Sequence, residues 1–214
     1  ETFTNLQQDP LYPYAWVYGN IIVNDYQAPA GYAVNMIHWG FDNTQAQART
    51  GTLFFYANTL VNNVPQNTFW YVSPFQIGQD GLAAASTTVE SASNIFWQQS
   101  DSEWRFLSAN AGVLDFKGTN YVPTGWYGTN PSLTADVRTV GATLLTGTNP
   151  LLTAAFAPQT GSPALNRGGT GPSSTPEGAT ANNLLVTHQY AEGVGIIARP
   201  TQGVAADLGA LELP

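Results

Sequence analysis

One arrangement of hydrophobic and polar residues returns along the first 122 positions of the chain. It consists of alternating residues, then a small residue and an asparagine, and then a short apolar run. The clearest copies are residues 16–24 and 54–62, a weaker copy is 90–97, and a fourth is 115–122. Alternation with a period of two is typical of β-strands, and a repeated strand–turn–strand unit is typical of a stacked β-solenoid. The pattern therefore predicts an all-β chain built from stacked repeats.

The copies are unevenly spaced, which indicates constant repeats joined by loops of varying length. Three short strands of about five residues need roughly 20–25 residues with their turns. The surplus is expected to form long excursions at 26–50, 63–86 and 123–150. The repeat is lost after residue 150. We therefore assign 1–150 to repeats with inserted loops, and 151–214 to a C-terminal loop and capping segment of the same domain.

Each copy contains an asparagine for which there is a structural explanation. Asparagine tolerates the left-handed backbone that a bend between strands needs. Its side-chain amide can also hydrogen-bond to the neighbouring repeat and satisfy buried backbone groups. We therefore predict a structural asparagine ladder, not a ligand site, made of Asn20, Asn58, Asn94 and Asn120.

Composition excludes several classes of function. The chain has no cysteine, which excludes disulfides, thiolate catalysis and cysteine-ligated metals. Only 9% of the residues are charged, the net charge is −8, and no basic run offers a surface for nucleic acid. No stretch approaches the roughly 20 apolar residues of a membrane helix. The polarity comes instead from amides, hydroxyls and glycine, as in many secreted β-proteins.

Two parts of the sequence resemble a known family. Residues 51–61, Gly-Thr-Leu-Phe-Phe-Tyr-Ala-Asn-Thr-Leu-Val, are similar to the coil phrase of secreted bacterial right-handed parallel β-helix proteins, the pectate-lyase-like superfamily. Residues 161–168 and 207–212 resemble the C-terminal cap of such proteins. The resemblance implies a right-handed parallel β-helix with long loops and a C-terminal cap, in a protein that is secreted or lies on a bacterial cell surface.

Proteins of this family normally have several more coils on the N-terminal side. The chain thus looks like the C-terminal part of a larger β-helix, with Glu1 as a processed or truncated start. An uncovered first coil would expose apolar core and strand edges. We therefore expect either missing N-terminal coils or another protein chain to cover it.

The residues offer one candidate catalytic cluster. His38, Asp42 and Arg49 lie in the first excursion, and Arg105 can join them from a later coil. Histidine is a good general base near neutral pH. The structural alternative is that His38 hydrogen-bonds within its loop and that Arg49 pairs with Asp42. The second histidine, His188, has no close acidic neighbour apart from Glu192, and we interpret it as structural.

Weaker candidates concern metal and sugar binding. Strand alternation places Asp101, Glu103 and Arg105 on one face, where the two carboxylates can bind a hard cation such as Ca²⁺ or pair with the arginine. No other cofactor is implied. Tryptophans in loops can stack on sugar rings, and the best placed are Trp39, Trp70 and Trp126.

Two functions remain open from the sequence. The first is an extracellular module with a structural or carbohydrate-binding role, as part of a larger chain or assembly; few titratable residues favour it. The second is the C-terminal part of a polysaccharide lyase or glycoside hydrolase, which the family resemblance favours. Fold alone does not decide between them.

Overall fold

The computed structural model describes residues 9–26, 34–40, 50–64, 72–78, 87–99, 109–110, 112–128, 136–172, 184–191, 193–200 and 203–213. Within these ranges the chain is all-β and has no α-helix. In chain order the strands are β1 (Tyr14–Tyr18), β2 (Ile21–Asn24), β3 (Val34–Trp39), β4 (Gly51–Tyr56), β5 (Thr59–Asn62), β6 (Val72–Ile77), β7 (Thr87–Ala92), β8 (Ile95–Gln98), β9 (Ala109–Asn110), β10 (Val113–Lys117), β11 (Thr119–Pro123), β12 (Asp136–Arg138), β13 (Thr143–Gly147), β14 (His188–Ala191) and β15 (Gly195–Ala198).

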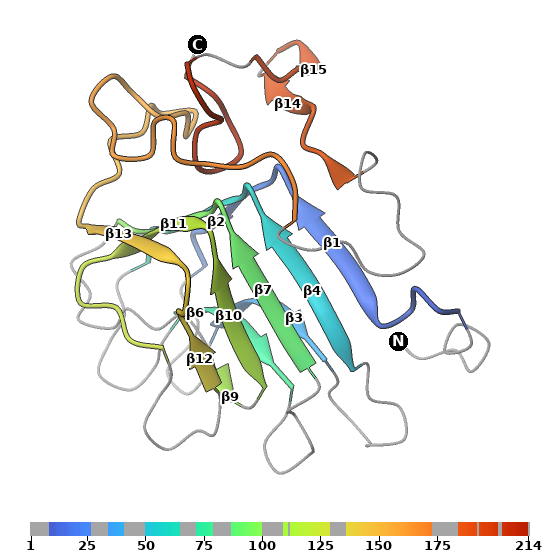
Figure 1. The fold of residues 1–214 in the computed structure, drawn as a ribbon. Coiled ribbons are helices and arrows are strands. Elements are labelled where there is room, and N and C mark those ends of the chain that lie inside the picture. The colour runs from blue at the N-terminus through green and yellow to red at the C-terminus, as the bar shows by residue number, and fades with distance from the viewer. Residues whose placement is uncertain are drawn as a thin grey trace.

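The first thirteen strands form three parallel sheets. The first sheet has the order β1-β4-β7-β10-β12, the second β2-β5-β8-β11-β13, and the third β3-β6-β9. Figure 1 shows the first sheet facing the viewer, from β1 to β12, with β3 and β6 behind it. We call β1–β3, β4–β6 and β7–β9 the first, second and third repeats, β10–β11 the fourth and β12–β13 the fifth. The predicted all-β class is confirmed, and the stacked strands are parallel.

The long excursions contain strands that the sequence pattern did not identify. β3 lies in 26–50 and β6 in 63–86, and the two pair in register from Val34↔Val72 to Trp39↔Ile77. β12 and β13 lie in 123–150 and pair with the fourth repeat. The prediction that these segments are only loops is therefore wrong. The copies share an asparagine phrase at the corner between the first and second sheets. β3 and β6 lie beyond that corner, and the corner between β12 and β13 has no asparagine.

The core lies between the sheets and is built by alternation. Side chains that face inward on β4, β7 and β10 of the first sheet are buried, and those on the outer strands β1 and β12 are half-buried. A phenyl cluster fills the interior, with Phe55 and Phe75 packed edge to face and their ring centroids 5.1 Å apart. Parallel strands with buried inner faces use this apolar stacking to stabilise the sheet. The main inward-facing residues are Leu53, Phe55, Phe75, Ile77, Val89, Phe96, Leu114 and Phe116.

The four aligned asparagines form a continuous ladder of hydrogen bonds. The backbone N–H and the side-chain NH₂ of Asn20 both donate to Asn58 Oδ1, at 3.0 and 3.1 Å. Asn58 donates in the same way to Asn94 Oδ1, at 2.9 and 3.2 Å. Asn94 donates to Asn120 Oδ1, at 3.2 and 3.3 Å. In each of these three pairs, the N–H and NH₂ of one asparagine thus donate to the Oδ1 of the asparagine in the following repeat.

The bend at the first three corners is made by the residue before the asparagine, and not by the asparagine itself. Gly19, Ala57 and Ser93 have φ angles of 68°, 50° and 59°. The expectation that asparagine supplies the left-handed backbone is therefore corrected. Asparagine is needed for its side chain, because only a short amide both donates to one repeat and accepts from the other.

The C-terminal segment folds back onto the repeats as a cap. Residues 207–212 form no strand; they are held by hydrogen bonds to the body of the molecule. The Asp207 carboxylate accepts from the backbone N–H groups of Asn166 and Leu213, at 2.7 and 2.9 Å. The N–H of Ala210 donates to Thr59 Oγ1 at 3.1 Å. The cap thus connects the end of the described chain to the second repeat.

Candidate binding groove

A β-hairpin stands beside the corner of the first repeat. β14 and β15 pair antiparallel, with Tyr190 opposite Ile196, and the chain turns at Gly193 with a φ of 76°. Figure 1 shows the hairpin above the C-terminal end of β1. Val186, which precedes the hairpin, is buried against the outward-facing rings of β4. The hairpin is therefore positioned by the segment that leads into it.

A buried ion pair fixes the other side of the hairpin. Arg199 Nε lies 2.5 Å from Glu212 Oε1, and both side chains are almost completely buried. The Arg199 guanidinium also donates to the carbonyls of Asp207 and Gly209, each at 3.2 Å. Burial raises the pKa of Glu212, and the nearby Arg199 guanidinium opposes that rise. Because Arg199 directly follows β15, the ion pair and these hydrogen bonds connect the hairpin to the cap.

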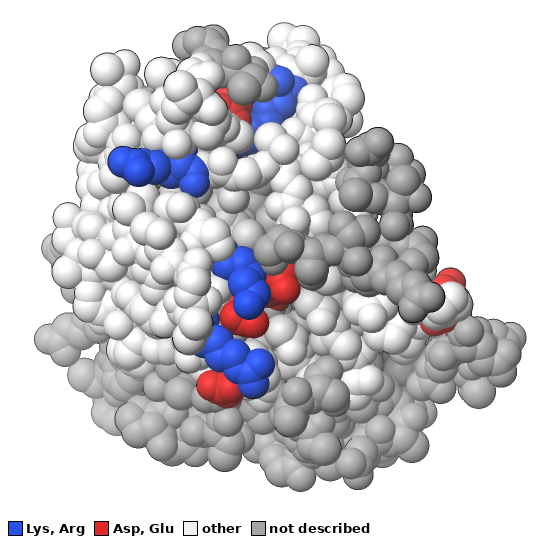
Figure 2. Space-filling view, in the orientation of Figure 1, with Lys and Arg blue, Asp and Glu red and all other residues white. Residues whose placement is uncertain are grey.

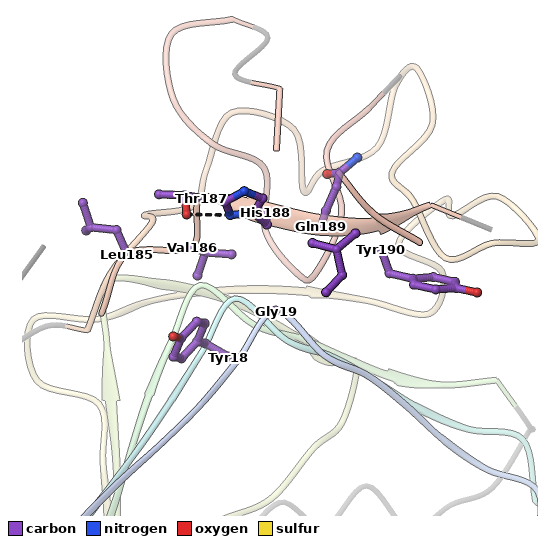
Figure 3. Close-up of a pocket in the computed structure, with 9 residues that line it drawn as sticks. Tyr18, Gly19, Leu185, Val186, Thr187, His188, Gln189 and Tyr190 are labelled. Carbon is purple, nitrogen blue, oxygen red and sulfur yellow. Dashed lines mark hydrogen bonds between the residues drawn. The ribbon is translucent and has the colours of Figure 1, made fainter. Parts of the chain in front are cut away.

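The space between the hairpin and the first repeat is an open groove of about 590 Å³. Figure 3 shows Tyr18 and Gly19 on one side and the hairpin residues on the other. The volume lies within the range of small-molecule pockets. We call this space the binding groove; it is lined by Tyr18, Gly19, Leu185, Val186, Thr187, His188, Gln189, Tyr190 and Ile196.

Two tyrosines supply aromatic surface to the binding groove. Tyr18 is half-buried and stacks on Tyr56, with ring centroids 4.9 Å apart and planes 19° apart. Tyr56 is held in turn by a hydrogen bond from its hydroxyl to the Leu184 carbonyl. Burial, and then the neighbouring Tyr18, raise the pKa of Tyr56, so this hydroxyl stays protonated. Tyr190 is 58% exposed, so its ring is accessible from solvent.

The polar groups of the binding groove are uncharged or weakly basic. The imidazole Nδ1 of His188 lies 2.9 Å from Thr187 Oγ1, and His188 is exposed. None of the described residues that line it is Asp, Glu, Lys or Arg. Figure 2 shows that the charged side chains on the viewed face lie in a few small groups, some containing both signs and others a single sign, with uncharged surface over much of the rest. The binding groove therefore suits a ligand with hydroxyl groups and apolar faces.

A second feature lies on the outward face of the first sheet. One row of residues in register crosses it: Trp16 pairs with Phe54, Phe54 with Glu90, and Glu90 with Asp115. Trp16 and Phe54 stack with centroids 5.8 Å apart, and the buried Trp16 Nε1 has no partner in the described part of the chain. Asp115 pairs with Lys117 at 2.9 Å. Neighbouring strands thus carry two carboxylates beside an aromatic surface.

The catalytic cluster predicted from the sequence is only partly within the described residues. His38 is exposed and lies near the end of β3, in register with Gln76 of β6. Asp42, Arg49 and Arg105 lie outside the described residues. The cluster therefore stays a prediction.

The predicted calcium ligands and sugar-stacking tryptophans have mixed outcomes. Asp101, Glu103 and Trp70 lie outside the described residues. Trp39 is only 5% exposed, and its indole N–H donates to the Gly51 carbonyl at 3.3 Å. Trp126 is half-buried and packs edge to face on Phe116. The expectation of an exposed Trp39 ring is corrected, because alternation along β3 turns that side chain into the core.

Two negative findings concern the described part of the chain. It contains no group of three or more His, Asp or Glu side chains arranged to hold a metal ion. No helix in it has the length and apolar character to cross a bilayer.

Sequence reasoning missed the binding groove. The sequence favours a structural role for His188, whose only close acidic neighbour is Glu192, whereas in the structure His188 lines the groove with Tyr190. A signal was present in the alternation of 188–198 and in its two glycines at 193 and 195. The chemistry of the groove is inferred from its own side chains, because comparisons of the chain with protein-family models, characterised proteins and solved structures find no match.

Proposed function

We propose that this chain is an extracellular, right-handed parallel β-helix module that binds carbohydrate in the binding groove. The strand order supports the β-helix, because in each sheet every strand is followed by its counterpart from the next repeat. The resemblance of residues 51–61 and 207–212 to secreted bacterial β-helix proteins supports the location. Low charge and many amide side chains agree with an extracellular surface.

The observation that carries the proposal is an uncharged groove with two tyrosines. Sugar rings present apolar C–H faces to aromatic rings and hydroxyls to polar groups. Tyr18 and Tyr190 supply the rings, while His188 and Thr187 supply hydrogen-bonding groups. The chain as a whole carries a net charge of −8, which repels polyanions. We therefore assign neutral polysaccharides as the ligand class.

Affinity gel electrophoresis tests the proposal directly. Purified protein is run through gels containing a neutral β-glucan, a galactomannan, starch or polygalacturonate. We expect retardation in at least one neutral gel and none with polygalacturonate. Isothermal titration with an oligosaccharide of the retarding polymer then gives the affinity. Tyr190→Ala is expected to weaken binding about tenfold, which corresponds to about 1.4 kcal/mol.

Tyr26→Ala is the matched control. Tyr26 is 62% exposed, close to the 58% of Tyr190, but it does not line the binding groove. We expect Tyr26→Ala to bind as the wild type does. Equal losses in the two variants, or no retardation by any neutral polysaccharide, would refute carbohydrate binding in this groove.

The row of carboxylates favours a second candidate function, a glycoside hydrolase or polysaccharide lyase. Glycoside hydrolases use two carboxyl groups on either side of the bond that they cleave. Glu90 and Asp115 are direct neighbours across β7 and β10, beside the stacked Trp16 and Phe54. Release of reducing ends, or absorbance of an unsaturated product, measures this activity. We expect Glu90→Gln to abolish it; a wild-type protein without activity on any tested polymer contradicts the candidate.

A further inference from the structure

The two ends of the stack of repeats differ in how they are protected. The last strand of the first sheet, β12, has three residues and carries the ion pair Asp136–Arg138, with Nε and Oδ2 2.7 Å apart. The first strand, β1, has five residues, Tyr-Ala-Trp-Val-Tyr, and no charge. Short strands and charges are the usual protection of a sheet edge. β1 lacks both, and no strand in the described ranges pairs with its outer edge.

At the first repeat, no layer of strands from the described part of the chain covers the hydrophobic core. Ala15 and Val17 face inward but are only half-buried, while their partners Leu53 and Phe55 on β4 are 2% and 0% exposed. The same contrast separates β2, with no fully buried apolar residue, from β5, which is buried throughout. A further layer of strands would bury these residues as the second repeat is buried.

The asparagine ladder has a direction, and this direction defines what fits. Asn58, Asn94 and Asn120 each accept, at Oδ1, the backbone N–H and the side-chain NH₂ of the asparagine in the repeat before. Asn20 is exposed, and its Oδ1 accepts no hydrogen bond within the described part of the chain. The first corner therefore presents an acceptor that matches the backbone N–H and side-chain NH₂ of one more asparagine.

Backbone hydrogen bonds at the later corners show which backbone groups of the first corner a further repeat would bind. The N–H groups of Thr59, Ile95 and Tyr121 each donate to the asparagine carbonyl of the preceding repeat, at 2.9 Å in all three cases. The equivalent donor in the first repeat is Ile21. The N–H of Gly19 donates to the Ala57 carbonyl, and that of Ala57 to the Ala92 carbonyl, each at 3.0 Å, so the equivalent acceptors in the first repeat are the Gly19 and Tyr18 carbonyls. In chain order, the first corner thus offers backbone carbonyl acceptors, the Asn20 Oδ1 acceptor and the Ile21 N–H donor.

We propose that the first repeat is a docking surface for a strand–asparagine–strand unit of a partner protein, stacked in the same direction as the repeats of this chain. The partner supplies an asparagine whose N–H and NH₂ bind Asn20 Oδ1, and strands that pair with β1 and β2 by β-augmentation. A second copy of the chain does not fit. Head to head, two Asn20 Oδ1 acceptors would meet, and the corner before β13 has no asparagine to donate.

The test uses a peptide copied from the second repeat as a probe. Within the chain, this repeat stacks on the third repeat in the way that the partner is proposed to stack on the first. A synthetic peptide of residues 50–64, with two lysines at each end for solubility, is added to the full chain. We expect saturable binding by fluorescence anisotropy and slower hydrogen exchange of the backbone amides of 14–24. Asn20→Ala is expected to weaken binding about tenfold, while Val140→Ala, at an exposed position near β13, leaves it unchanged.

A double-mutant cycle keeps the test independent of folding defects. The same peptide carrying alanine at the position of Asn58 is expected to bind wild-type protein about tenfold more weakly. It is expected to lose little more against Asn20→Ala, because the two changes remove the same hydrogen bonds. Additive losses, protection of β12 and β13 instead of β1 and β2, or a homodimer whose 14–24 amides are already protected would each overturn the proposal. None of these outcomes depends on carbohydrate binding.

Discussion

Replacing Asn58 by alanine removes the central rung of the asparagine ladder. Asn58 is completely buried, and its Oδ1 accepts both donors of Asn20. Its NH₂ donates to the Val17 carbonyl at 2.8 Å, to the Tyr56 carbonyl at 3.0 Å and to Asn94 Oδ1 at 3.2 Å. Alanine keeps only the two backbone bonds, from its own N–H to Asn94 Oδ1 and from the Ile95 N–H to its carbonyl. The Asn20 N–H and two carbonyls therefore lose partners.

The magnitude follows from the number of groups left unpaired. A buried polar group that loses its hydrogen bond costs about 1–3 kcal/mol, and partly buried groups lie at the low end. Three such groups give a loss of about 3–5 kcal/mol in the free energy of unfolding, which is a large fraction of typical domain stability. Asn20→Ala is expected to cost about 1 kcal/mol, because Asn20 is exposed and water replaces its bonds.

Equilibrium urea unfolding, followed by tryptophan fluorescence and circular dichroism, measures both variants. The free energy in water is obtained by linear extrapolation for each. We expect Asn58→Ala to unfold at clearly lower urea than Asn20→Ala. A difference of less than 1 kcal/mol between the two variants would refute the reasoning, because the ladder would then contribute no more when buried than when exposed.

Three further outcomes follow from buried groups. Tyr121→Phe should leave stability unchanged or raise it by up to about 1 kcal/mol in urea unfolding, because its buried hydroxyl has no partner among the described residues, whereas Tyr56→Phe should lower stability by about 1 kcal/mol. Gly51→Ala should cost at least about 3 kcal/mol in the same assay, since a Cβ there meets the Pro13 carbonyl at a φ of 117°; Gly141→Ala, with a φ of 78° and open space, should cost about 1 kcal/mol. Burial raises the pKa of Tyr121 to about 12 from 10.0, so the unfolded chain loses this proton first and stability should fall as pH rises from 10 to 12; a Tyr121→Phe protein with the same pH slope contradicts this.

The repeats were predictable because their signal is local. Asn20 and Asn58 lie in phrases of the same length, and a constant phrase around an asparagine indicates stacking. The strands at the third sheet were not predictable in this way. β3 and β6 pair in register, but Val34 and Val72 are the only identical residues at paired positions. Their pairing can be predicted only after the asparagine corners of the first and second repeats have been aligned.

The carboxylate row shows why register limits what a sequence indicates about a site. Glu90 lies four positions before Asn94, and Asp115 lies five positions before Asn120. Aligning the asparagines therefore pairs Glu90 with Phe116, on the opposite face of the strand. In the structure Glu90 pairs with Asp115, because the fourth repeat takes one extra residue at Gly118 before its asparagine. A single inserted residue thus prevents an alignment of the asparagines from showing that the two carboxylates are neighbours.

The cap connects distant parts of the chain, and this has a consequence for the order of folding. Rungs of the asparagine ladder join residues 38, 36 and 26 positions apart. The bond from Ala210 to Thr59 joins residues 151 positions apart. Longer loops cost more entropy to close, and contacts of long sequence separation slow folding. We therefore expect the repeats to form early and the hairpin to close late, so that the binding groove is the last part of the molecule to mature and the first to open under stress.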